Sequence, residues 1–285
     1  MTRLSEIETH IASMDGMLDI VGAMRSLAGM RMQEALKALP AVRRYGDGLK
    51  TGVAEARALV APAERASASA GGATAHVLCM AEHGFVGAFN ETLNETARHT
   101  VAAGDVLFVL GSRGAALAVE RGLDVAWMHP MASRASAVPR MVQVLLAELY
   151  AQIARGTLTR VSVIYTRYQS AGAPEIVKRT ILPLDPAALE ASSARLPPLH
   201  NLAPLRLLEK LMAEYVFAEL SEAAVESIAS ENAARFAAME SAHENVSKKL
   251  DKLRQDARTA RQSEITTELI ELVTGAEAAT SAPGL

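Results

Sequence analysis

One stretch near the C-terminal end of the chain, Leu205 to Thr274, contains neither Gly nor Pro. Because these two residues interrupt helices most strongly, the stretch predicts a single helix of roughly 105 Å at a rise of 1.5 Å per residue. Its apolar residues trace one narrow stripe that drifts around the helix, and the other positions are largely polar, as in "SKKLDKLRQDARTARQSE". A helix of this length has no core of its own, so it requires a helical partner.

The N-terminal segment, from about Leu4 to Leu59, is the one other stretch long enough to be that partner. Its apolar residues recur in steps of three and four, the period of a coiled-coil seam. The seam begins with Leu4, Ile7, Ile11, Met14, Leu18 and Val21. Arg25 interrupts the seam, which suggests that its side chain points at a partner. Pro40 is expected to bend the segment rather than end it, because an amphipathic pattern resumes after it. The two segments together predict an antiparallel coiled coil.

Three glycines lie inside the N-terminal helix, and each costs about 1 kcal/mol relative to Ala there. They are Gly16, Gly22 and Gly29. One interpretation is that the helix is weak or broken at these positions. The other is that the partner helix comes close enough to exclude a side chain.

The spacing of apolar residues changes in the middle of the chain. Short apolar runs at 75–82, 105–111, 124–130 and 160–168 predict strands buried on both faces, and helical patterns separate them. A further strand at 175–184 follows "SAGAP" and is expected to form a hairpin with the fourth. The fold class is therefore α/β, with a small, mostly parallel, five-stranded Rossmann-like domain inserted between two long terminal helices.

The expected domain boundaries follow from this change of period and from linkers rich in Ala, Ser, Gly and Pro. The linkers are 64–74 and 192–204. They divide the chain into an N-terminal coiled-coil helix (1–72), the α/β domain (73–200) and a C-terminal coiled-coil helix (201–285).

Composition limits the classes of function. A net charge of −3 argues against a nucleic-acid surface. Neither a run of 18 apolar residues nor a signal or transit peptide is found, so we expect no transmembrane segment. Aromatic residues make up only 4% of a chain that is half apolar, which suits Ala-rich helices with closely spaced axes. The single cysteine, Cys79, excludes a disulfide within the chain and suits a reducing compartment.

The usual motifs of an α/β enzyme are missing. The sequence has no Gly-Lys pair and so no P-loop, and the glycines of "GDGLKTG" (46–52) have the wrong spacing for a dinucleotide site. "GSRG" (111–114) follows a strand and opens a helix, where backbone amides could hold an anion, but four residues are a weak signal. The histidines lack metal-ligand spacing, and mid-strand Cys79 is better explained as a core residue than as a nucleophile. We therefore expect no catalytic residue, no metal and no cofactor.

Several motifs carry a resemblance to the gamma subunit of ATP synthase. "ITTELIELVTGA" is similar to the family's C-terminal signature I-T-x-E-x-x-E-x-x-x-G-A. The matching residues are Ile265, Thr266, Glu268, Glu271, Gly275 and Ala276. "GFVGAFN" (84–90) resembles the family's G-L-C-G-x-x-N, and "AMRSLAGMRM" (23–32) resembles A-M-K-M-V-A-A-x-K-M. The resemblance also covers "SENAARFAAME" (230–240) and "ARQSEIT" (260–266), so it reaches both ends of the chain and the domain between them.

The resemblance implies a non-catalytic central shaft of a rotary motor. Its partners would be a hexamer of alpha and beta subunits, the epsilon subunit and the membrane c-ring, at the cytoplasmic face of a bacterial inner membrane. The shaft would couple proton or sodium flow to ATP synthesis or hydrolysis. The residues implied to contact other subunits are Met24, Arg25, Arg261, Gln262, Thr266 and Glu268. Those implied to shape a turn rather than bind a ligand are Gly84, Gly87 and Asn90.

The N-terminal helix departs from the family pattern. Where the family reads like I-R-R-R-I-K-S-V-K-N-T-Q-K-I-T-K-A-M, this chain has "IETHIASMDGMLDIVGAM" (7–24), with acidic Glu8, Asp15 and Asp19. This puts the electrostatic contact surface in doubt but not the fold. The coupling ion is not encoded in a subunit of this kind.

Two other classes of protein remain as alternatives. A metabolite-binding α/β enzyme with helical arms would bind a ligand on its own, and the missing motifs count against it. A coiled-coil scaffold would form a stable homodimer through its long helices and would need no other subunit.

Overall fold

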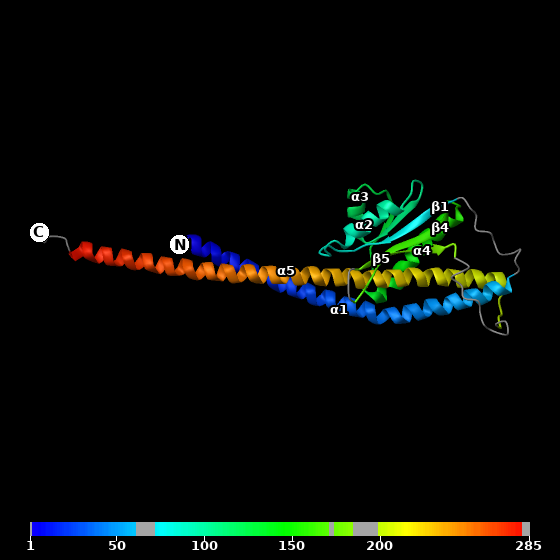
Figure 1. Cartoon of the computed structure of the whole chain (residues 1–285), viewed down its shortest axis with the longest axis horizontal. Helices are drawn as coiled ribbons and strands as arrows, with labels where there is room; N and C mark the ends of the chain where they lie inside the picture. Colours follow the sequence, from blue (N-terminus) through cyan, green and yellow to red (C-terminus); the bar gives the residue numbers. More distant parts are fainter. Residues whose placement is uncertain (1, 61–71, 171–173, 185–198, 281–285) are drawn as a thin grey trace. The chain divides into compact units, whose positions relative to one another are not determined.

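The computed structural model describes residues 2–60, 72–170, 174–184 and 199–280. Two long helices, α1 (Thr2–Leu59) and α5 (Pro204–Thr280), accompany a five-stranded sheet (Figure 1). Helix α1 continues through Pro40, so the prediction that this proline does not end the segment is confirmed. The predicted linkers lie largely outside the described residues.

The chain forms two compact units, and both long helices contribute to each. One unit comprises Leu27–Phe236, and the other comprises Met1–Ser26 with Ala237–Leu285. We call them the sheet unit and the tip unit. None of the described helices is both long enough and apolar enough to cross a membrane.

The sheet unit alternates strands and helices, as the changing hydrophobic period predicts. In chain order its elements are β1 (Ala73–Cys79), α2 (Phe89–Thr100), β2 (Val106–Leu110), α3 (Ser112–Glu120), β3 (Val125–His129), the short 3₁₀ helix η1 (Ala135–Ala137), α4 (Val138–Ala154), β4 (Leu158–Arg167) and β5 (Glu175–Leu182). The strand order is β3-β2-β1-β4-β5. The first four strands pair in parallel, and β5 pairs antiparallel with β4. The predicted mostly parallel sheet with a final hairpin is therefore confirmed.

Two cores lie on opposite faces of this sheet. On one face α4 and α5 pack against β1, β2 and β4, with α1 contributing Ala35 and Leu39. On the other face α2 and α3 pack against the same strands. Full burial is thus limited to β1, β2 and β4. The expectation that the run at 124–130 is buried on both faces is wrong, because β3 lies at the edge of the sheet and alternates half-buried with exposed residues.

The part of α5 beneath the sheet is buried almost all round, because α1 covers one side of it and the sheet covers the other. Two serine hydroxyls in this part of α5 donate hydrogen bonds to backbone carbonyls of the sheet. The Ser227 hydroxyl donates to the Cys79 carbonyl at 3.1 Å, and the Ser230 hydroxyl donates to the Thr166 carbonyl at 2.9 Å. These bonds fix α5 against the carboxyl ends of β1 and β4.

In the tip unit, α1 and α5 run antiparallel. Arg25 meets Glu240, Asp15 meets Arg254, and Glu8 meets Arg261. In the sheet unit the same direction is shown by Arg43 opposite Glu222 and Lys50 opposite Glu219. The predicted antiparallel pairing of the two terminal helices is confirmed within each unit.

Candidate functional site

The last turns of α5 carry four of the residues implied to contact other subunits, and all four are exposed. The Arg261 guanidinium donates to the Glu8 carboxylate at 2.7 Å across the helix pair. The Thr266 hydroxyl donates to the Gln262 carbonyl at 2.8 Å within the helix. Glu268 lies two residues further along the helix. These side chains are accessible to a surrounding protein.

The same turns expose a row of large apolar residues. Ile265, Leu269 and Leu272 are 52%, 57% and 70% exposed. The C-terminal signature lies entirely in this part of α5. Its residues are Ile265, Thr266, Glu268, Glu271, Gly275 and Ala276. Monomeric proteins rarely leave such rows uncovered, so the row indicates a contact surface.

Met24 and Arg25 lie half-buried in the tip unit. The Arg25 guanidinium donates to the Glu240 carboxylate at 2.9 Å. The sequence suggests that the Arg25 side chain points at a partner, and within this chain it pairs with Glu240 of α5. Glu240 gave no signal in the sequence, because a Glu in a polar stretch of helix is usually solvated.

Two of the three acidic residues that replace the family's basic stretch, Asp15 and Glu8, have partners as well. The Asp15 carboxylate accepts from Arg254 at 3.1 Å, and Glu8 accepts from Arg261. Both pairs are about half exposed, so each contributes no more than about 1 kcal/mol. Their effect is to match acidic residues near the start of α1 to basic residues of α5.

Helix α1 continues through all three helical glycines, so the interpretation that it is broken at them is wrong. A Cβ placed on Gly16 or Gly22 would meet no atom within 4 Å, so close approach of a partner does not explain either residue. A Cβ on Gly29 would lie 3.4 Å from two ring carbons of Phe236. Close approach of α5 therefore accounts for Gly29 alone.

The loop between β1 and α2 contains Gly84 and Gly87, and the first turn of α2 contains Asn90, the third residue implied to shape a turn. Gly87 has a φ of 56°, and exposed Phe85 has a φ of 61°, which is unusual for a residue with a side chain. The Asn90 side-chain oxygen accepts from the Ala81 amide at 2.9 Å and joins the two ends of the loop. No atom lies within 4 Å of a Cβ placed on Gly84.

Arg235, a buried arginine of α5, contacts the β1–α2 loop. The sequence analysis did not single out this residue. The Arg235 guanidinium donates to Glu231 at 2.7 Å, to the Asn232 side chain at 3.2 Å, and to the carbonyls of His83 and Gly84 at 3.3 and 3.4 Å. Burial raises the pKa of Glu231, and the charge of Arg235 opposes that rise. The available signal was the four-residue spacing of Glu231 and Arg235 in an apolar stretch.

The possible anion site at "GSRG" is filled by the chain itself. The Glu82 carboxylate accepts from the amides of Ser112 and Met131 at 3.0 and 2.8 Å. Burial raises the pKa of Glu82, but these bonds outweigh it, and the pKa lies below its ordinary value. A Cβ on Gly114 would overlap the Met80 side chain, so this glycine serves helix–strand packing.

A Ser-His-Asp chain of hydrogen bonds crosses the sheet. The His76 Nδ1 lies 2.7 Å from the Ser162 hydroxyl, and Nε2 lies 3.1 Å from the Asp105 carboxylate. His76 and Ser162 are 3% and 2% exposed, on neighbouring strands β1 and β4, so a substrate cannot reach the hydroxyl. The chain of bonds joins the strands and provides no accessible nucleophile.

Cys79 is likewise inaccessible. Its side chain is 1% exposed, and burial raises the pKa of its thiol to about 12, so the prediction of a core residue is confirmed. Across the described part of the chain, no three His, Cys, Asp or Glu side chains gather as metal ligands.

Comparison with known proteins agrees with the architecture. The sequence model of the ATP synthase family ("ATP-synt: ATP synthase") matches residues 3–279. The ATP synthase gamma chain of Chlorobium luteolum is 28% identical over 98% of this chain and 99% of the relative. The gamma chain of Gluconacetobacter diazotrophicus is also 28% identical, over 98% of this chain and 100% of the relative.

Solved structures share the fold. A chain of the mitochondrial ATP synthase of Euglena gracilis, in a structure of OSCP, F1 and c-ring, superposes with a TM-score of 0.69 at 13% identity. The match covers 99% of this chain and 97% of that one. A chain from the central stalk and c-ring of the Tetrahymena thermophila enzyme matches with a TM-score of 0.52, at 16% identity over 78% of this chain and 99% of that one. The family match over nearly the whole sequence, on a sheet unit held by two antiparallel terminal helices, shows that this chain belongs to the ATP synthase gamma-chain family.

Proposed function

We propose that this chain is the central rotor shaft of a bacterial rotary ATP synthase. The observation that carries the proposal is the exposed end of α5, where polar side chains around Arg261 alternate with an uncovered apolar row beginning at Ile265. A shaft must be stiff, and two paired helices supply stiffness. It must also turn inside a sleeve, which requires a surface that contacts several subunits in succession.

The partners of such a shaft are a hexamer of alpha and beta subunits, an epsilon subunit and the c-ring of the membrane sector. The exposed tip residues of α5, together with Met24 and Arg25, are the proposed contacts with the catalytic subunits. An asymmetric helix pair contacts each of three identical catalytic sites differently, and such differential contact shifts their conformational equilibria.

The shaft itself takes no part in the chemistry. It works at the cytoplasmic face of the bacterial inner membrane and couples proton or sodium flow to ATP synthesis or hydrolysis. In this assignment residues 1–72 and 201–285 form the shaft, and residues 73–200 form the domain inserted between its two helices. The buried state of Ser162 and Cys79, and the occupation of the α3 N-terminus by Glu82, support a non-catalytic role.

Co-expression with the alpha and beta subunits from the same genome tests the assignment. We expect one copy of this chain for every three of each partner, measured by native mass spectrometry. The chain alone is expected to be poorly soluble, because its apolar tip lacks its sleeve. A well-behaved homodimer that ignores those subunits would support the scaffold alternative and overturn the shaft assignment.

A further inference from the structure

Three glutamates of α5 form a row in the sheet unit at spacings of three and four residues, which places them on one face of the helix. We call Glu219, Glu222 and Glu226 the acidic row. Glu219 and Glu226 have side chains only 1% exposed, and Glu222 is 12% exposed. Ionised carboxylates are costly to bury without cations, so this row requires partners.

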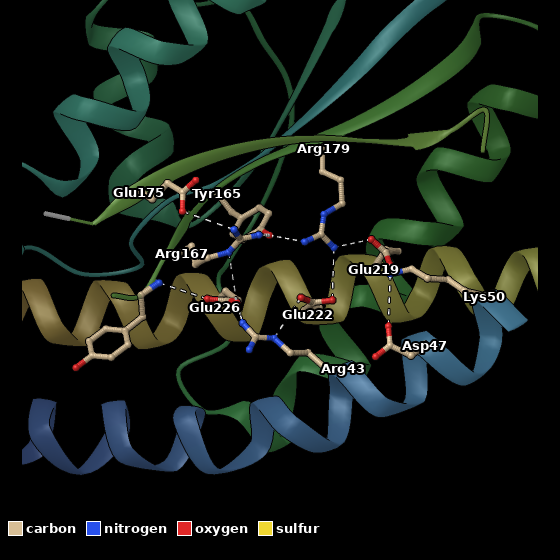
Figure 2. Close-up of polar contacts among 11 residues, drawn as sticks. Arg43, Asp47, Lys50, Tyr165, Arg167, Glu175, Arg179, Glu219, Glu222 and Glu226 are labelled. Carbon is tan, nitrogen blue, oxygen red and sulfur yellow. Dashed lines mark hydrogen bonds and ion pairs between the residues drawn. The ribbon is translucent and has the colours of Figure 1, made fainter. Parts of the chain in front are cut away.

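Each carboxylate of the row has one cation from α1 and one from the β4–β5 hairpin. Lys50 lies 3.2 Å from Glu219, and Arg43 lies 3.5 Å from Glu222 and also pairs with Glu226. These two cations belong to α1. Figure 2 shows α1 on one side of the row and the hairpin on the other.

The hairpin supplies the opposite set of contacts. The Arg179 guanidinium of β5 lies 2.6 Å from Glu219 and 3.4 Å from Glu222, and Arg167 of β4 lies 3.9 Å from Glu226. The Arg179 guanidinium also donates to the Tyr165 hydroxyl at 2.8 Å, which orients it. Burial lowers the pKa of Arg179, but its bonds to Glu219 and to neighbouring groups outweigh this and raise the pKa above its ordinary value.

This arrangement differs in kind from the apolar packing around it. The α5 residues that face the sheet next to the row are small or aliphatic, as at Ala223, Ala224 and Ile228. Apolar burial resists separation of the surfaces but is non-directional, so it opposes sliding or rotation weakly. Charge-assisted hydrogen bonds are directional, and here they hold α5 from both flanks.

We infer that the acidic row and its four cations form the joint that locks the inserted domain to the helix pair against torque. The inference rests on the proposed shaft function and adds to it the residues that transmit rotation between the helices and the domain. Rotation of α5 in either sense stretches the contacts on one flank, so the joint resists torque in both directions. The four cations are positioning residues, because they act through α5 and touch no substrate.

The test uses the complete complex, reconstituted with its membrane sector in vesicles. It compares ATP hydrolysis with ATP-driven ion transport in Arg179→Met, which removes the cation that Glu219 and Glu222 share from the sheet side and leaves the α1 contacts in place. Removing hydrogen bonds to a charged group shifts an equilibrium by about tenfold or more. We therefore expect hydrolysis within about twofold of the unmodified complex and about threefold fewer ions transported per ATP.

The matched control is Arg155→Met. Arg155 pairs with Glu148 at 3.6 Å on the surface of α4, with 62% of its side chain exposed, and it lies outside the joint. We expect this control to transport ions as the unmodified complex does. Equal loss in both variants would show a general effect of charge and would overturn the inference.

A purely structural role is distinguished by the ratio of the two activities. If hydrolysis and transport fall together with the amount of assembled complex, the row merely stabilises the fold and the inference is wrong. Unchanged transport per ATP in Arg179→Met also overturns it. Where that variant fails to assemble, Glu222→Gln decides between the same outcomes, because the amide keeps the volume and removes the charge. Failure of the unmodified chain to assemble with its partners would instead refute the shaft function itself.

Discussion

Removing Arg235 should leave the buried Glu231 carboxylate without its hydrogen-bonded cation, which favours the protonated form of this side chain. In Arg235→Met the Glu231 carboxylate loses its 2.7 Å partner while its side chain stays 6% exposed. Burial already raises the pKa of Glu231, and the opposing charge of Arg235 would be gone. We therefore expect the pKa of Glu231 to rise further in the folded variant.

The magnitude follows from the loss of one partner of a buried ion pair, which costs about 3–5 kcal/mol. Lost bonds to the His83 and Gly84 carbonyls add about 1 kcal/mol. Arg31 also favours the ionised form of Glu231 and offsets part of the total. We expect a net loss of about 3–4 kcal/mol in the free energy of unfolding.

The sign of the pH dependence is fixed by the same group. The folded variant binds one proton more than the unfolded chain at any pH between the unfolded pKa of Glu231 and its raised folded pKa. Stability of the variant should therefore rise as the pH falls through that interval, by up to about 1.4 kcal/mol per pH unit. The double variant Arg235→Met with Glu231→Gln should recover about 2 kcal/mol and lose this slope.

Urea titration read by pulse proteolysis measures these quantities. The full chain is used at low concentration, where association is slow, and cleavage is followed within residues 27–236, which contain both cores. A loss below about 1 kcal/mol, or a stability that does not rise toward acid, would refute the reasoning, because it would show that the charge of Glu231 does not depend on Arg235.

Three further outcomes can be checked. Gly22→Ala should raise the free energy of unfolding by up to about 1 kcal/mol, since helix propensity improves and the site is open; an unchanged or lower urea midpoint would contradict that geometry. Arg261→Ala should reduce the coupling of ATP hydrolysis to rotation more than Gln262→Ala, by at most about a hundredfold, because a bond to a charged group is worth about 1.5–3 kcal/mol and a neutral one about 0.5–1.5. A thousandfold or greater loss in single-turnover hydrolysis, which corresponds to about 4 kcal/mol or more, would mean that either residue acts in catalysis. Cys79 should resist thiol reagents in the folded chain at mildly alkaline pH, because its pKa is about 12; rapid labelling would show that β1 opens.

The long helices and the strands of this fold could be predicted from the sequence, because each follows from a hydrophobic pattern along its own segment. The stretch without Gly or Pro and the seam beginning at Leu4 predicted both long helices, and the change of period predicted every strand. Such patterns are local, because each reflects one element and the side that it buries. The exposure of β3 could not be predicted this way, since its position at the edge depends on which strands pair.

Pairings between distant residues were the part that the sequence did not reveal. Arg25 was recognised as a residue that faces a partner, but Glu240 lies 215 positions away and has no distinguishing pattern. Arg235 resembled a solvated residue until the β1–α2 loop was placed above it. Buried charges of this kind depend on the meeting of separate elements, which no single stretch encodes.

The ion pairs of the tip unit tie the two ends of the gene together. Asp15 and Arg254 are 239 residues apart, and Glu8 and Arg261 are 253 apart, yet each member is matched in charge to the other. A hybrid that takes its first helix from a relative with a basic N-terminus would set like charges face to face at both positions. Recombination within this gene would therefore exchange two weakly favourable ion pairs for two like-charge contacts, at a cost of about 1 kcal/mol each.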